Sequence, residues 1–177
     1  MTIRKADGFA LIDLMFVCGI IGILATIAVP RLVAARNSAT ITSAVATMRT
    51  ISTAQLSFAI SCGNGFYAPD LPALAKTPPG TSVGFVGPDL GTAAIVVRQN
   101  FTIQMEGTSF AGAPDTCNTI GPNLGASAYR AGADPLDPTI LRFFAINALG
   151  VVYEDEASLY PVMPESAIPP AGHPVNR

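Results

Sequence analysis

A continuous apolar segment near the N-terminus constrains this chain more than any other feature. Residues 9–29, FALIDLMFVCGIIGILATIAV, contain only two polar side chains, Asp13 and Thr26, in 21 positions. A helix of that length rises about 31 Å at 1.5 Å per residue, which matches the roughly 30 Å hydrocarbon core of a membrane. The segment therefore predicts a transmembrane helix. Arg4 and Lys5 before it predict a cytoplasmic N-terminus and an exported remainder.

The helical pattern continues beyond the apolar segment. Residues 31–61 contain no turn cluster, and apolar side chains recur there at spacings typical of one helix face. We therefore predict one helix over residues 9–62, half in lipid and half beneath a folded head, with Pro30 weakening it locally. The apolar stripe comprises Ile41, Val45, Met48, Ile51 and Phe58, with Arg49, Thr53 and Gln55 mostly off it.

A cleaved secretory signal peptide is a competing interpretation of the N-terminus. Such a peptide has a basic start and an apolar core of roughly 7–15 residues. Here the apolar segment is longer, and it runs on without a turn. An exported soluble enzyme with a cleaved signal would begin beyond residue 30 and would lack the long helix.

Membrane anchoring alone does not explain Asp13. A carboxylate costs roughly 2.5–3.5 kcal/mol at the centre of a transmembrane helix, and less toward an end, so a partner usually satisfies it. No Lys or Arg lies within residues 9–17, which leaves another chain, or an amine newly made by cleavage nearby. Alternatively, the carboxylate reaches the membrane interface from the first helical turn, where the helix dipole favours negative charge.

Taken together, these residues resemble the prepilin signature of type IV pilins and type II secretion pseudopilins. The resemblance rests on Gly8, the following Phe9-Ala10-Leu11-Ile12-Asp13-Leu14-Met15, the apolar run and Ile27-Ala28-Val29-Pro30. It implies that a prepilin peptidase cuts between Gly8 and Phe9 and methylates Phe9. It also implies that Asp13, where the family usually has glutamate, pairs with the N-terminal amine of a neighbouring subunit, and that Gly22 and Pro30 are helix-weakening positions. Aspartate is one methylene shorter than glutamate, so this pair would be weaker or would require a slightly closer approach.

Beyond residue 62 the composition changes to Gly, Pro, Ser and Thr with short apolar runs, as expected of loops and strands. Residues 100–106, NFTIQME, alternate like a strand, and residues 141–146 and 151–154 flank a turn as a hairpin. We therefore predict an α+β fold, with the long helix packed against a small antiparallel sheet, an arrangement that is also pilin-like. Further expected elements are a helical turn near residues 71–76, strands at 94–98 and 127–133, and an irregular tail from residue 161.

The low and scattered charge argues against a nucleic-acid partner. Only 12% of the residues are charged, the net charge is −2, and the ten Lys and Arg are scattered, so no nucleic-acid surface is expected.

Cys62 and Cys117 lie beyond the apolar segment, and Cys18 lies inside it. A Cys62–Cys117 disulfide in an oxidising compartment is expected, with two unpaired buried thiols as the alternative.

No motif predicts an enzyme or a cofactor. The single histidine, His173, lies in the Pro-rich tail, where it matches neither a metal-ligand spacing nor a Ser/His/Asp arrangement. An acidic run near the second strand of the hairpin offers oxygen ligands of the kind calcium prefers, although no EF-hand pattern is present and such a run is also typical of a solvated loop. The calcium candidates are Glu154, Asp155 and Glu156, with Asp134 and Asp137.

These observations favour a non-enzymatic subunit of a type IV pilus-like filament. Its parts are a leader at residues 1–8, a helix at 9–62 with a transmembrane segment at 9–29, and a β-rich head at 63–177. We expect a single-pass protein of the bacterial inner membrane with a periplasmic head. Prepilin peptidase and an inner-membrane assembly platform would pass it into a periplasmic or extracellular filament with other copies of itself and related pilins. The alternatives are a type II secretion pseudopilin and, in another class, a single-pass anchored periplasmic binding module that keeps Met1.

Overall fold

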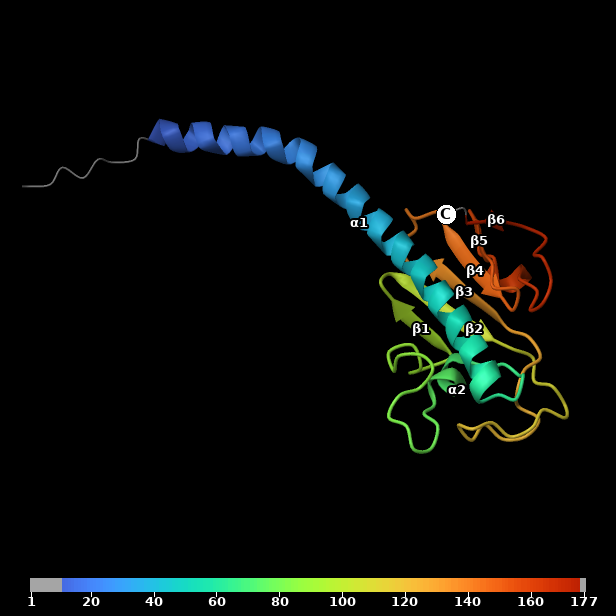
Figure 1. The fold of residues 1–177 in the computed structure, drawn as a ribbon. Coiled ribbons are helices and arrows are strands. Elements are labelled where there is room, and N and C mark those ends of the chain that lie inside the picture. The colour runs from blue at the N-terminus through green and yellow to red at the C-terminus, as the bar shows by residue number, and fades with distance from the viewer. Residues whose placement is uncertain (1–10, 176–177) are drawn as a thin grey trace, which may run out of the picture. The chain divides into compact units, whose positions relative to one another are not determined.

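The computed structural model describes residues 11–175 of the chain. The chain divides into two compact units, Met1–Ala39 and Thr40–Arg177. Helix α1, Leu11–Ser61, contributes to both units (Figure 1). We call residues 11–39 the stem and residues 40–177 the head unit.

The stem is helical throughout. Residues 12–36 are all exposed, and within the described part of the chain α1 is the one helix long and apolar enough to cross a membrane. Pro30 removes one backbone hydrogen bond, but the helix does not end there and continues to Ser61. The predicted long N-terminal helix is confirmed.

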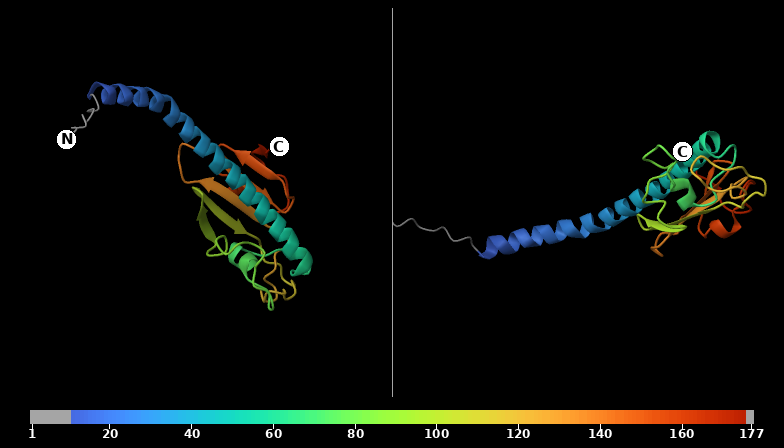
Figure 2. Two further views of the ribbon diagram at one scale, coloured as in Figure 1. Left: turned by 60° about the vertical axis from the view of Figure 1, so that its left-hand side comes forward. Right: turned by 90° about the horizontal axis from the view of Figure 1, so that it is seen from below.

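The head unit is built on one antiparallel sheet. The described residues form six strands in chain order, each antiparallel to the next. Figure 2 shows the head part of α1 lying along one face of this sheet, which confirms the predicted α+β fold. The strands are β1 (Ile95–Arg98), β2 (Phe101–Glu106), β3 (Arg130–Pro135), β4 (Phe143–Asn147), β5 (Val152–Asp155) and β6 (His173–Pro174).

Alternating apolar side chains join the sheet to α1. In β2, Phe101, Ile103 and Met105 are buried whereas the residues between them are partly exposed, as a period of two predicts. On α1 the predicted stripe supplies the opposing surface, with Met48 and Ile51 wholly buried in the same core. Burying a side chain of this size stabilises by roughly 1.5–3 kcal/mol, so this contact holds the head unit together.

Gln55 differs from the sequence prediction, which put it mostly off the buried stripe. It is wholly buried. Its Nε2 donates to the Ala68 carbonyl at 2.8 Å, and its Oε1 accepts from the Ala68 amide at 2.9 Å. The chain turns back under α1 after the helix ends, and a glutamine there satisfies both backbone groups of a buried residue, which an apolar side chain cannot do.

The third strand begins later than predicted, at Arg130 rather than near residue 127. Just before it, the amide of Ala126 donates to the Tyr67 carbonyl, and the Tyr67 amide donates back to Ala126. This backbone is therefore paired with the segment after α1 and not yet with β2. The predicted hairpin of β4 and β5 and the predicted helical turn, α2 (Leu71–Ala75), are confirmed.

The tail from residue 161, expected to be irregular, is partly regular. Residues 156–175, here called the C-terminal strap, contain the 3₁₀ helix η1 (Tyr160–Val162) and strand β6, which pairs with β5. The strap covers the sheet face away from α1, because that face is apolar over β4 and β5. The buried cluster beneath the strap consists of Ala145, Tyr153, Leu159 and Met163.

Two residues of the sheet fit the strap closely. The wholly buried Asn147 donates from Nδ2 to the carbonyls of Pro164 at 2.8 Å and Ala167 at 2.7 Å. Gly132 lies under Tyr160, and a Cβ at this glycine would stand 2.8 Å from the Tyr160 Cβ. The strap is thus fastened by specific polar contacts and by close packing.

Candidate functional site

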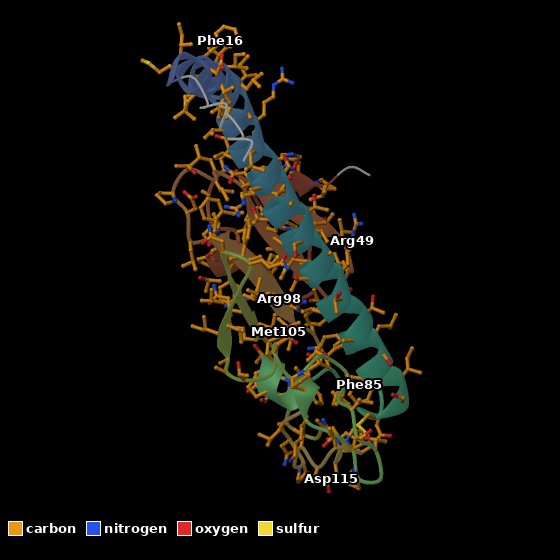
Figure 3. All side chains as sticks on the ribbon, turned by 90° about the vertical axis from the view of Figure 1, so that its left-hand side faces the viewer. Phe16, Arg49, Phe85, Arg98, Met105 and Asp115 are labelled. Carbon is orange, nitrogen blue, oxygen red and sulfur yellow. A yellow bond between two sulfur atoms is a disulfide. The ribbon has the colours of Figure 1, made fainter. Side chains whose placement is uncertain are left out.

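The stem presents apolar side chains around the helix. The exposed fraction is 70% at Phe16 and 69% at Ile23, and Figure 3 shows side chains projecting around Phe16. None of its apolar window is buried within the chain. An apolar surface of this extent marks a membrane or protein contact.

Asp13 lies in the first turn of α1. It takes part in none of the ion pairs among the described residues, and the sequence between Asp13 and Arg31 contains no Lys or Arg. Gly8 and Phe9, the predicted cleavage and methylation positions, lie outside the described residues. Within the described chain, the Asp13 carboxylate therefore has no cation.

The other stem residues singled out in the sequence fit an unbroken helix. The Thr26 Oγ1 donates to the Ile23 carbonyl at 2.7 Å, which satisfies this hydroxyl inside an apolar segment. A Cβ at Gly22 would meet nothing within 4 Å, so packing inside the chain does not require this glycine. Small residues let helices approach closely. The helix passes through both Gly22 and Pro30 without interruption.

Cys62 and Cys117 form a disulfide, as predicted, with a Cα–Cα distance of 4.8 Å. The bond joins the residue after α1 to a loop 55 positions later, and the Cys117 amide also donates to the Cys62 carbonyl. Cys18 is a free thiol in the stem. A disulfide favours an extracytoplasmic head, because cytosolic reductants keep most thiols reduced.

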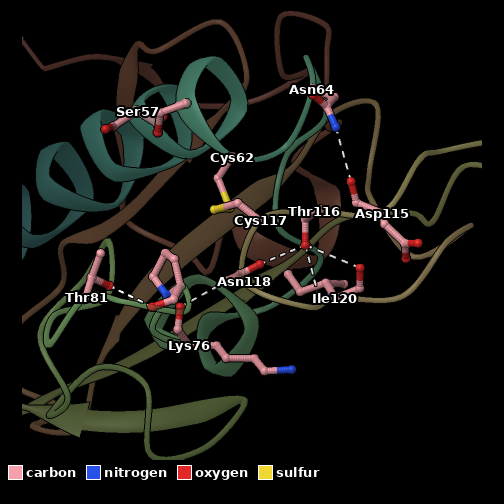
Figure 4. The surroundings of a disulfide bond; sticks show 12 residues. Ser57, Cys62, Asn64, Lys76, Thr81, Asp115, Thr116, Cys117, Asn118 and Ile120 are labelled. Carbon is pink, nitrogen blue, oxygen red and sulfur yellow. Dashed lines mark hydrogen bonds between the residues drawn. A yellow bond between two sulfur atoms is a disulfide. The ribbon is translucent and has the colours of Figure 1, made fainter.

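Polar contacts organise the loop around the disulfide (Figure 4). The Thr116 hydroxyl donates to Asn118 Oδ1 at 2.8 Å. Asn118 Nδ2 donates in turn to the carbonyls of Ala73 and Lys76 at the end of α2. The disulfide joins the end of α1 to the loop between β2 and β3, and the hydrogen bonds of Asn118 join that loop to α2.

The acidic run meets a guanidinium group and an imidazole ring at the edge of the sheet. Glu154 forms an ion pair with Arg142, and its Oε1 lies 3.1 Å from Nε2 of His173 in β6. His173, predicted to lie in an irregular tail, is therefore held next to β5. These residues line a shallow hollow together with Asp155 and Glu156. Glu154, one of the calcium candidates, is already bound by the side chains of Arg142 and His173.

The remaining calcium candidates are dispersed. Asp137 Oδ1 accepts from the Thr139 amide and hydroxyl, and Asp134 Oδ2 accepts from the Ser158 hydroxyl at 2.7 Å. Asp155 Oδ1 accepts from the amide that follows it. Among the described residues, no three His, Cys, Asp or Glu side chains are placed to share a metal ion.

Another ion pair fastens the C-terminal strap. The Arg130 guanidinium donates to Glu106 Oε1 and to the Met163 carbonyl, and it lies 5.2 Å from the centre of the Tyr160 ring. The hydrogen bond from Arg130 lowers the pKa of Glu106, and burial raises the pKa of Tyr160 to about 12. At neutral pH this cluster therefore holds one charge of each sign.

Asp134 leads to a prediction about pH. Its Oδ1 is buried without a hydrogen-bond partner, and burial raises its pKa. A raised pKa in the folded state favours folding at acid pH, and that advantage is lost as the pH rises through the folded pKa. Asp134→Asn should therefore raise the Tm of the full chain in detergent at pH 7 and should have little effect at pH 3.

Asp137→Asn is the matched control for this experiment. The hydroxyl and amide of Thr139 lower the pKa of Asp137, so removing its charge should not raise the Tm at pH 7. If Asp134→Asn lowers the Tm at pH 7, or shifts it equally at pH 3, burial of the charge is not destabilising.

Sequence reasoning missed the Arg142–Glu154 pair, although a signal was present. Opposite charges stand near the open end of the predicted hairpin, where cross-strand neighbours attract. Nothing in the sequence near Asp134 indicates that its side chain is buried, because its hydrogen-bond partner, Ser158, lies 24 positions away in the strap.

The architecture is pilin-like: a long apolar N-terminal helix packed, in its second half, on a six-stranded antiparallel sheet formed by the described residues. No protein-family model, curated protein or solved structure matches the chain significantly.

Proposed function

We propose that this chain is a non-enzymatic structural subunit of a type IV pilus-like filament. One observation carries the proposal: an exposed apolar stem bears a single acid without a cation among the described residues, and the helix that forms the stem continues into the core of the head. A plain membrane anchor needs neither the acid nor the continuity.

In this proposal the stem lies first in the inner membrane and then among the stems of other subunits. Exchanging lipid for other helices changes little apolar exposure, so close packing and polar pairs decide association. Cleavage between Gly8 and Phe9 by a prepilin peptidase supplies an N-terminal amine. The carboxylate of Asp13 then pairs with the amine of a neighbouring subunit as an inner-membrane platform adds subunits to the filament.

Mass spectrometry of the mature N-terminus tests the proposal directly. We expect a chain that begins at a methylated Phe9. An intact Met1 would indicate the anchored binding module instead, and a start beyond residue 30 would indicate an exported soluble protein. Either of these results contradicts the filament proposal.

A further inference from the structure

Charge is segregated along the chain. Residues 14–62 contain three arginines, Arg31, Arg36 and Arg49, and no Asp or Glu. Residues 63–177 contain ten Asp or Glu and five Lys or Arg, a formal net charge of −5. The long helix is therefore basic after its apolar segment, and the part of the head unit that follows the helix is acidic.

Arg31 and Arg36 directly follow the apolar segment. Both are exposed, and neither joins an ion pair among the described residues. In a membrane these guanidinium groups lie near the depth of the lipid phosphates, which attract them. A filament has no such phosphates, so after assembly the two guanidinium groups are left to water and dissolved counterions unless carboxylates of a neighbouring subunit lie beside them.

One end of the sheet offers such anions. The C-terminal end of β2 lies beside Gln55, because Met105 contacts that side chain. The strand registers put the ends of β3 and β5 at the opposite end of the sheet, away from Gln55. This end also carries the Arg142–Glu154 pair and His173. Three further acids at or just beyond it form no ion pair with described residues: Asp137, Asp155 and Glu156.

We propose that, in the filament, Arg31 and Arg36 of one subunit bind the carboxylates at this sheet end in the head of a neighbouring copy. This inference rests on the proposed function and names a contact that selects and orients the partner subunit. A second copy is the occupant that the charges favour, because each copy brings both an acidic head and a basic stem. Without such cations, neighbouring acidic heads would repel one another.

The test is a charge swap within one chain. Cells that assemble filaments from the full-length protein would express the double variant Arg31→Glu with Arg36→Glu. The amount of the protein in sheared filaments would be compared with its amount in the membrane fraction. We expect at least about a tenfold loss of filament, because reversal turns attraction into repulsion at every contact. Adding Glu156→Lys should recover a substantial part of the loss.

Asp115→Lys is the matched control for the rescue. Asp115 is also exposed and forms no ion pair with described residues, but it lies in the disulfide loop beyond the C-terminal end of α1 (Figure 3). It should not rescue the arginine variant. Formation of the Cys62–Cys117 disulfide in each variant reports that the head was exported and folded.

The outcomes separate this inference from the proposed function. If the unaltered chain makes no filaments, the proposed function fails. If the unaltered chain forms filaments and they survive the arginine reversal, only the contact between stem and head is overturned. The same holds if the reversal abolishes filaments and neither Glu156→Lys nor any other change at the sheet end restores them, and that result would assign the arginines to lipid. Equal rescue by Asp115→Lys would overturn it too, since net charge alone would then suffice.

Discussion

Replacing Asp13 by alanine is expected to abolish filaments while leaving membrane insertion intact. In the proposed filament the carboxylate is buried among apolar stems beside the amine of a neighbour. Removing one partner of a buried ion pair costs about 3–5 kcal/mol, because the other charge is left uncompensated. In a lipid bilayer the same change removes a polar group from an apolar helix, so insertion is not impaired. Sheared filaments and membrane fractions measure the two effects separately.

Two conservative variants make this prediction sharper. Asp13→Asn keeps the size and hydrogen-bonding capacity but not the charge, and should fail like alanine. Asp13→Glu keeps the charge and adds one methylene, and should still assemble. Normal filaments from Asp13→Ala would contradict the proposal, and failure of all three variants would point to packing at this position rather than to an ion pair.

Loss of the disulfide is expected to have the largest effect on the stability of the head. Joining two residues separated by 55 positions stabilises by about 4 kcal/mol in the chain-entropy treatment of the unfolded state. The double variant Cys62→Ser with Cys117→Ser should therefore lower the free energy of unfolding by about that amount. Urea titration of the full chain in detergent, followed by the tyrosine signal of the head, measures the difference.

Cys18→Ser is the matched control for the disulfide experiment. Cys18 is a free thiol in the stem, so its loss should leave urea unfolding of the head unchanged. Reductant should destabilise the parent chain and Cys18→Ser alike, and should not affect the double variant. A difference below about 1 kcal/mol between the parent and the double variant would mean that the unfolded head is already compact near the two cysteines.

The sequence predicts those parts of the fold that rest on strong periodicity. The apolar run and the stripe containing Met48 and Ile51 give α1, and the alternation in residues 101–106 gives β2. Polarity alone places Gln55 toward the surface, but its partner is the backbone of Ala68. A contact between a side chain and a distant backbone leaves no periodic signal.

The strap escaped prediction for a related reason. Its proline-rich composition is typical of irregular chain, and its order comes from the apolar second face of β4 and β5 and from the buried amide of Asn147. For the candidate site, the residue pattern and the prepilin resemblance are enough to single out Asp13, because a lone acid in an apolar run is visible in the amino-acid order itself. The cleavage at Gly8 and Phe9 remains a prediction for the mature protein.

The course of α1 has a mechanical consequence for a fibre under tension. In the proposed filament, a pull on the stem would pass along α1 into the head, because residues of the same helix lie in the hydrophobic core of the head. At its far end the helix leads directly to Cys62, which is covalently linked to Cys117. Tension that drew the helix lengthwise from the sheet would therefore also load a covalent bond.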